Sequence, residues 1–177
     1  MRAGTRMDVR TGAKERRVGA IPPVVDDLLT RALVCELAVV NAKGEAVVHP
    51  LIPLWDGTHV YMTSSVLFSK KLEHIKRDKR VSLSITDPIA TGGSKARCVI
   101  QGDARIIEDD PHETWEEVLP LWRAKEPAID SFLGKRFALP LFFERALIEV
   151  TPTRISWWAD GDPSQAPQTL DLAGAVA

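Results

Sequence analysis

Residues 59–86 read HVYMTSSVLFSKKLEHIKRDKRVSLSIT, and this stretch determines how the rest of the sequence is interpreted. Residues 59–62 alternate between polar and apolar side chains, which predicts a half-buried strand. Residues 70–77 place apolar side chains on one face and charged side chains on the other, which predicts a short basic helix. Residues 80–86 alternate again and predict a second strand. Three consecutive hydroxyl residues follow the first strand: Thr63, Ser64 and Ser65.

The start of this helix has the composition of a phosphate-binding site. Ser69 can cap the helix, and Lys70 and Lys71 lie in its first turn. A helix N-terminus carries unpaired N–H groups and partial positive charge, so two lysines there oppose the helix dipole unless an anion compensates them. The pattern therefore predicts a phosphate site. A solvated helix face that is simply basic is an equally good interpretation of the spacing alone.

Length and composition favour a single folded domain with a basic N-terminal extension. The chain has 177 residues, of which 45% are hydrophobic, enough for one domain with a real core. The formal net charge of −1 argues against a general nucleic-acid binder. Residues 1–20 are rich in arginine and show no periodicity, which predicts a flexible basic arm. Binding of nucleic acid by this arm is a weaker alternative.

No feature of the sequence points to a membrane or to metal chemistry. No run approaches the roughly 18 apolar residues of a membrane span, and no hydrophobic segment follows the N-terminal charges, so we expect a cytoplasmic protein. Cys35 and Cys98 lie in separate apolar runs without CxxC spacing. They are interpreted as buried thiols and not as a redox pair or metal site, although sequence alone leaves a disulfide open.

The segment before residue 59 predicts a helix and a hairpin. A helix is expected over 23–32, and strands over 33–40 and 45–55 joined by a turn at 41–44. Pro50 and Pro53 cannot donate hydrogen bonds to a neighbouring strand. The second strand of the hairpin must therefore be an edge strand, be bulged, or face something other than a strand.

The segment after residue 86 predicts further strands and two helices. A long strand over 96–107 contains Gly102 as a bulge or point of close approach. Helices are expected from Asp110 onward and over 128–133, followed by an apolar connection over 137–143 and two last strands. These last strands are predicted over 145–151 and 154–158, and a loose C-terminal tail over 159–177. The fold class is therefore mainly β (α+β): an antiparallel split β-barrel of six to seven strands with peripheral helices, over residues 21–158.

Several of these features together resemble one known family. The turn at 41–44, Pro50, the Asp56-Gly57 hairpin, the run TSSVLFSKKLEHIKRDKRVSLSI (63–85) and the strand RCVIQGDARII (97–107) occur in the order and spacing of the pyridoxamine 5′-phosphate oxidase-like family. These are split barrels that bind FMN or a deazaflavin. The resemblance implies a homodimer with the cofactor at the subunit interface, acting on a small-molecule substrate.

The resemblance also implies which residues contact the cofactor. The hydroxyls of Thr63, Ser64 and Ser65 would contact phosphate or ribityl oxygens. Ser69, Lys70 and Lys71 match the phosphate grip of the family. Arg97 stands where FMN-binding relatives often carry a glutamine, and could make a forked charged contact. Strand residues His49, Pro50 and Leu51 would border the flat ring system.

Two departures from the family pattern limit what the chain is expected to do. The stretch between Thr63 and Ser69 is slightly longer than in pyridoxamine oxidases, and the C-terminal arginine and histidine arrangement that those enzymes use for substrate is missing. Oxidation of pyridoxamine phosphate is therefore not expected. Hydrolase and zinc motifs are also missing, and His74 is expected to face solvent.

These considerations leave two classes of function. The first is an oxidoreductase that transfers hydride through FMN or deazaflavin F-420. The second is a non-catalytic protein that binds or sequesters a flavin, a deazaflavin or haem.

Overall fold

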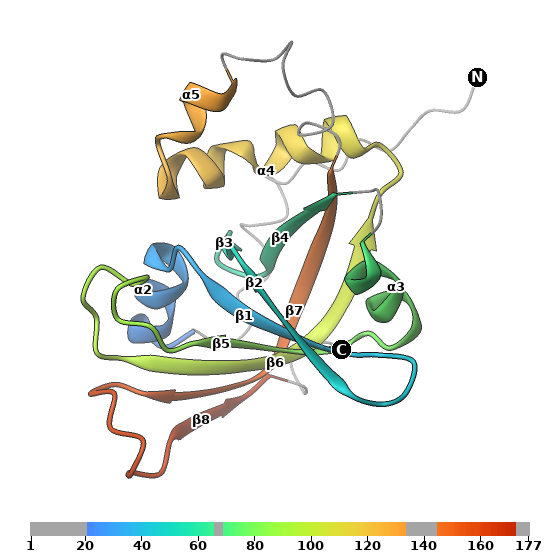
Figure 1. Cartoon of the computed structure of the whole chain (residues 1–177). Coiled ribbons are helices and arrows are strands. Elements are labelled where there is room, and N and C mark those ends of the chain that lie inside the picture. The colour runs from blue at the N-terminus through green and yellow to red at the C-terminus, as the bar shows by residue number, and fades with distance from the viewer. Residues whose placement is uncertain (1–20, 66–68, 134–144, 173–177) are drawn as a thin grey trace.

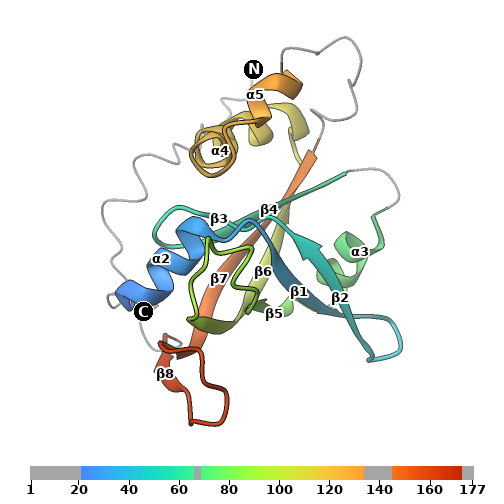
Figure 2. The same cartoon turned by 60° about the vertical axis from the view of Figure 1, so that its left-hand side comes forward.

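The computed structural model describes residues 21–65, 69–133 and 145–172, which form a curled antiparallel sheet flanked by helices (Figures 1 and 2). The strands are β1 (Cys35–Val40), β2 (Ala46–Leu51), β3 (Leu54–Trp55), β4 (Val60–Ser65), β5 (Arg80–Ile85), β6 (Arg97–Ile107), β7 (Arg145–Trp158) and β8 (Gln168–Asp171). The helices are α2 (Pro23–Arg31), α3 (Lys70–Arg77), α4 (Pro111–Lys125) and α5 (Ile129–Leu133). The predicted basic arm (1–20) and apolar connection (137–143) lie outside the described residues.

The strands follow the order β2-β1-β5-β6-β7-β4-β3, every pairing is antiparallel, and β8 pairs with β7. This arrangement confirms the prediction of a mainly β split barrel with peripheral helices. The predicted strand over 45–55 is divided into β2 and β3, and Pro53 lies between them. Strand β2 is an edge of the sheet, so Pro50 sits where a missing N–H is tolerated.

The C-terminal part of the chain differs from the prediction. Instead of two strands separated by a turn at 151–153, β7 runs continuously through Pro152. The reason is a register shift: Gly102 pairs with Pro152 and Gln101 with Arg154, so β7 carries one extra residue, Thr153, and is bulged directly after the proline. The tail is also not loose throughout. Strand β8 pairs with residues 154–157 of β7, and Leu172 is buried in the core.

The bulge depends on the missing side chain of Gly102. A Cβ atom at this position would lie 2.5 Å from the backbone oxygen of Thr151 and 2.9 Å from Cγ1 of Val150. Real Cβ atoms do not approach a backbone oxygen so closely, so the two strands would have to separate. The sequence-based prediction of a bulge or close approach at Gly102 is confirmed.

Substitution of Gly102 tests this contact. We expect Gly102→Ala to lower the free energy of unfolding by about 1–3 kcal/mol, because the added methyl group pushes against backbone that cannot rotate away. Urea unfolding followed by circular dichroism measures the change. The neighbouring exposed residue gives a control, since Gln101→Ala should change the free energy by no more than about 0.5 kcal/mol. Equal stabilities of the two variants would contradict the close-approach explanation.

Two apolar clusters hold the helices on the sheet. The larger one fills the inside of the curled sheet and receives α2 and α3, through residues that include Leu28, Leu29, Leu72 and Ile75. The smaller one lies under α4 and α5 and includes Trp115 and Trp122, whose rings meet edge to face with centroids 4.8 Å apart. The tryptophan-bearing face of α4 therefore packs on the sheet.

Both cysteines are buried and free, and so they form no disulfide with each other. Burial raises the pKa of Cys35 and of Cys98 to about 12, so each remains a neutral thiol near pH 7. Within the described ranges, none of the helices has the length and apolar character needed to cross a bilayer.

Candidate anion and cofactor site

The end of β4 and the start of α3 come together as residues 59–86 predict. Ser64, the last residue but one of β4, is buried, and its Oγ lies 2.8 Å from the Oγ of Ser69. Ser69 occupies the position before α3, but its side chain makes no capping hydrogen bond. The predicted capping role is therefore wrong, because the hydroxyl pairs with Ser64 instead. This pairing holds the first turn of α3, with its lysines, against the end of β4.

Thr63 faces the other side of β4 and brings a further cation to the site. Its Oγ1 accepts a hydrogen bond of 3.0 Å from Nε of Arg145, the first residue of β7. Thr63 is buried, whereas Ser65 is exposed. The end of β4 therefore presents hydroxyl groups on both faces, with α3 near one of them and Arg145 on the other.

The two lysines at the start of α3 lack carboxylate partners among the described residues. Lys71 is half-buried and Lys70 is exposed, and among the described residues neither has an acidic group within ion-pair distance. Burial lowers the pKa of Lys71, and the nearby Arg145 guanidinium lowers it further. Burial also lowers the pKa of Arg145. Positive charge is thus held in a partly desolvated place, where it is unfavourable without an anion.

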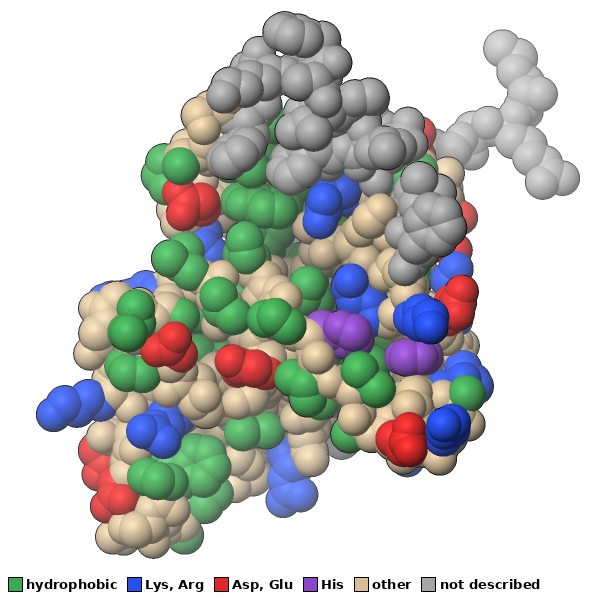
Figure 3. All heavy atoms as spheres, in the orientation of Figure 1, with side chains coloured by type: hydrophobic (Ala, Val, Ile, Leu, Met, Phe, Trp, Pro, Cys, Tyr) green, Lys and Arg blue, Asp and Glu red, His purple; other side chains and the backbone are tan. Residues whose placement is uncertain are grey.

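Two histidines complete the cluster. His49 lies on β2, on the side that also carries the partly buried Val47 and Leu51, and His74 lies one helical turn after Lys71. His74 is half-buried, so the prediction that it faces solvent is wrong. Burial lowers the pKa of His49, and the charges of Lys71 and then His74 lower it further. Figure 3 shows histidine side chains beside Lys and Arg side chains on this face.

The remaining predicted site residues lie in two places. Pro50 is exposed and points away from His49 and Leu51, because successive strand residues alternate between faces. Arg97 is the first residue of β6 and pairs with Trp158. The other end of β6 lies near the β4 hydroxyls, because Ile107 pairs with Leu147 and Leu147 also pairs with Thr63. Ten residues of extended chain, about 33 Å at 3.3 Å per residue, separate Arg97 from that end. A single subunit therefore brings together the β4, α3 and His49 residues, but not Arg97.

Arg145 and His74 are members of the cluster that the sequence did not identify. Arg145 is 82 residues from Thr63, and no spacing rule connects them; only the pairing of β4 with β7 does. His74 follows Lys71 by three residues, which puts the two side chains on one face of a helix. The three-residue spacing could therefore have placed His74 on the same helix face as Lys71 from the sequence alone.

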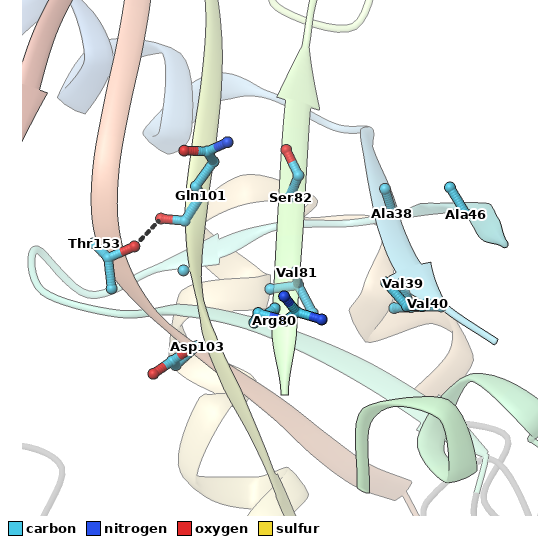
Figure 4. Close-up of a pocket in the computed structure, with 11 residues that line it drawn as sticks. Ala38, Val39, Val40, Ala46, Arg80, Val81, Ser82, Gln101, Asp103 and Thr153 are labelled. Carbon is cyan, nitrogen blue, oxygen red and sulfur yellow. Dashed lines mark hydrogen bonds between the residues drawn. The ribbon is translucent and has the colours of Figure 1, made fainter. Parts of the chain in front are cut away.

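A second feature lies on the outer face of the sheet. An open groove of about 580 Å³ crosses β1, β2, β5 and β6, and small side chains such as Ala38, Ala46 and Ser82 line it. Figure 4 shows these residues in a row with Gln101, next to Thr153, which donates a hydrogen bond to the Gln101 carbonyl oxygen. Val48 on the same side of β2 is 56% exposed.

The chemistry of the cluster is that of anion recognition. Hydroxyl groups, an ammonium, a guanidinium and two imidazoles can all donate to phosphate or carboxylate oxygens. In the part of the chain that the structure describes, no group of three or more His, Cys, Asp or Glu side chains could hold a metal ion. The cluster can therefore bind and orient the anionic end of a ligand, while redox chemistry would have to come from that ligand.

Comparisons with known proteins agree with the fold. An F420 reductase structure matches with a TM-score of 0.56 and 23% identity, over 77% of this chain and 98% of its own. A conserved hypothetical protein from Mycobacterium tuberculosis matches with a TM-score of 0.60 and 18% identity, over 86% and 96%. A heme binding protein from Mycobacterium smegmatis matches with a TM-score of 0.56 and 17% identity, over 88% and 60%.

No curated protein sequence matches the chain. The sequence profile described as pyridoxamine 5′-phosphate oxidase, however, matches residues 21–159, which is most of the chain. This match confirms the resemblance seen in the sequence and covers every strand of the curled sheet except β8. The chain belongs to the pyridoxamine 5′-phosphate oxidase family.

Proposed function

We propose that the protein is an oxidoreductase that uses FMN or deazaflavin F-420 to transfer hydride to or from a small molecule. The observation that carries this proposal is the cluster at the end of β4. There Lys71 and Arg145 are partly desolvated beside buried hydroxyls, and no carboxylate of the described residues pairs with Lys71. A phosphate-bearing cofactor would supply the missing negative charge. Family membership and the likeness to an F420 reductase support the same class of ligand.

The residues present fit the phosphate end of such a cofactor. His49 Nε2 and His74 Nδ1 are buried and have no hydrogen-bond partner among the described residues. Lys70, Lys71 and Ser69 would hold the phosphate, and Thr63 with Arg145 would fix the adjoining polar chain. The flavin or deazaflavin ring, when bound, supplies the hydride chemistry. The protein contributes binding, orientation and exclusion of water.

A non-catalytic binding protein is the second candidate. The likeness to a heme binding protein favours it, and haem also carries carboxylates that a cationic cluster could hold. Haem iron, however, needs an axial ligand. His49 and His74 both lie beside Lys71, whose charge disfavours a metal cation next to them. The cluster therefore suits an anionic group better than an iron centre.

Ligand identity and turnover distinguish these candidates. We expect mass spectrometry of the ligand released from native protein to detect FMN or a deazaflavin, and the visible spectrum of the bound cofactor to bleach when a hydride donor is added. Reoxidation by a small-molecule acceptor, at a rate above that of the free cofactor, would establish catalysis. Bound flavin without turnover on any acceptor would favour the binding protein, and bound haem would contradict the flavin proposal.

The lysines of α3 give a direct test of the phosphate grip. We expect the Lys70→Ala/Lys71→Ala variant to bind FMN about tenfold to hundredfold more weakly, because two charge-assisted contacts are lost. The affinity for riboflavin, which lacks the phosphate, should fall much less in the same variant. Fluorescence titration measures both dissociation constants, and Lys43→Ala, on the exposed turn before β2, is the matched control. Unchanged FMN affinity in a folded double variant would remove this assignment.

We further propose that the active form is a homodimer with the cofactor at the interface. The outer face of the sheet carries small side chains and the exposed Val48, and a second copy seated there would bury them. Arg97 lies on that same outer side, two residues before Val99 and four before Gln101. It could therefore reach a cofactor held by the phosphate cluster of the other subunit.

The oligomeric state tests this arrangement. We expect light scattering to give twice the chain mass for the native protein, and Val48→Glu to shift it to the monomer, because the new carboxylate would be buried in the interface. Thr30→Glu places the same charge on the exposed side of α2 and should leave the dimer intact. A native monomer, or a folded Val48→Glu variant that remains dimeric, would contradict the proposed interface.

A further inference from the structure

The turn between β3 and β4 is held together by the side chain of Asp56. Its Oδ1 accepts hydrogen bonds from the backbone N–H groups of Thr58 and His59, each 2.7 Å long. Its Oδ2 accepts a hydrogen bond of 3.1 Å from the hydroxyl of Tyr61. The backbone hydrogen bond across the turn, from Asp56 to the carbonyl of His59, is longer at 3.4 Å, and the edge strand β3 has two residues. This carboxylate is therefore the main support of a short hairpin.

His59 lies against the same carboxylate. Its Nδ1 is 3.8 Å from Oδ2 of Asp56, which is within ion-pair distance but too long for a hydrogen bond. The Asp56 side chain is 11% exposed and the His59 side chain 30%, so water screens the pair only in part. His59 and Tyr61 are alternate residues on one face, with ring centroids 6.0 Å apart. At this distance the attraction depends on charge, and only the protonated imidazole carries one.

A second buried carboxylate lies on the same face of the sheet. Glu149 of β7 pairs with Tyr61 in the strand register and is 5% exposed. Arg105 of β6 pairs with Glu149 and donates two hydrogen bonds to it, of 2.6 and 2.8 Å. Helix α4 contributes only apolar side chains to the cluster that contains Tyr61, and these are Trp115, Val118, Leu119, Leu121 and Trp122.

The charges in this group do not balance when His59 is neutral. Two carboxylates, Asp56 and Glu149, stand against the single guanidinium of Arg105, which leaves one negative charge among these side chains. An imidazolium at His59 brings the sum to zero. The contact with Asp56 raises the pKa of His59, and the charge of Glu149 adds to the rise, whereas burial and Arg105 oppose it. Although burial tends to raise the pKa of Asp56, the contacts with His59 and Thr58 lower it below its ordinary value.

We propose that His59 is a proton-dependent latch on the β3–β4 turn: its imidazolium binds the Asp56 carboxylate and holds the turn closed, and loss of the proton loosens the turn. No ligand takes part, so this inference does not depend on the proposed cofactor site. The turn precedes β4, and the hydroxyls of the candidate site lie at the other end of that strand. The latch therefore sets how firmly the strand of the site is held at its far end.

The direction of the pH effect follows from linkage. A histidine that is more basic in the folded chain than in the unfolded one binds its proton more tightly in the native state. Its contribution is complete below the ordinary pKa of 6.5 and is lost as the pH rises through the higher pKa of the folded protein. The turn should therefore be tightest in mildly acidic solution and loosen in mildly alkaline solution.

Nuclear magnetic resonance of the native protein measures both parts of the proposal, with no ligand added. The imidazole signals of His59 should titrate with a pKa above 6.5. Protection of the Thr58 and His59 amides against hydrogen exchange, corrected for the intrinsic rate, should fall about twofold to fivefold between about pH 6 and about pH 8.5, as expected for a partly exposed ion pair. The turn between β1 and β2 is the matched internal control, because Asn41 Oδ1 accepts the N–H groups of Lys43 and Glu45 without carrying a charge. Protection of these two amides should not follow the His59 titration.

Two variants distinguish a latch from a turn that does not respond to pH. His59→Gln removes the titrating group, so protection at Thr58 should no longer change as the native protein does. Asp56→Asn keeps the Oδ1 acceptor but removes the charge, so the pKa of His59 should fall relative to the native protein. If Asp56→Asn does not fold, the His59→Gln comparison alone decides. A native His59 pKa at or below 6.5, or a folded His59→Gln variant that keeps the native pH dependence at Thr58, would overturn the proposal.

Discussion

The pairing of three strands with β7 is the constraint on which the rest of the structure depends. This strand has 14 residues; β6 pairs along most of its length, β4 pairs with its first residues and β8 with its last. β4 and β8 pair with successive parts of β7, so both lie along the edge of β7 that β6 leaves free, and the sheet ends at β2 and β3. The bulge after Pro152 adds the local twist that a curled sheet needs. The predicted ligand contacts lie at the two ends of β7. Thr63 is bound to Arg145 at one end, and Arg97 pairs with Trp158 at the other.

The distribution of charge separates the candidate site from the remaining surface. Several other basic side chains near the sheet have acidic partners: Lys76 with Glu108, Lys79 with Asp103, and Arg80 with Asp78. Such exposed pairs contribute little to stability, but they leave no net charge to attract a ligand. Lys71 lacks such a partner although it is more deeply placed than those three lysines and arginines. A cation that is desolvated and unpaired works against folding, and proteins usually retain that conflict where a ligand resolves it.

Local signals in the sequence predicted the parts of the fold that local chemistry decides. Pro50 indicated an edge strand because it cannot donate to a neighbour, and the Asp56-Gly57 pair indicated a turn that needs the positive φ of 96° found at Gly57. Gly102 indicated a close approach because glycine has no side chain, and any Cβ atom at this position would collide with the backbone of Thr151. In each case the property belongs to the residue itself and does not depend on a distant partner.

The errors arose where a distant partner decides. Pro152 has the signature of a turn, but a bulge at Thr153 lets the chain continue as β7, and only the pairing with the distant strand β6 shows this. Ser69 has the signature of a cap, but Ser64 competes successfully for its hydroxyl. Arg145 joins Thr63 only through strand pairing across 82 residues. The lysines of the site were therefore predictable from a helix pattern and His49 from the family resemblance, whereas Arg145 and His74 were not identified.

The separation of Arg97 from the cation cluster has a thermodynamic consequence for the proposed dimer. If one ligand contacts the cluster of one subunit and Arg97 of the other, then ligand binding and subunit association are linked equilibria: each must strengthen the other by the same factor. Dilution of the apoprotein would dissociate the dimer, and the separated subunits would bind the cofactor more weakly because each lacks the contact from the other. The small side chains of the outer face, including Ala38 and Ser82, bring little binding energy individually, since burial stabilises in proportion to apolar area. A cofactor shared between subunits would add the electrostatic contribution that this smooth face lacks, so the same anion that relieves the repulsion among the cations would also hold the two sheets together.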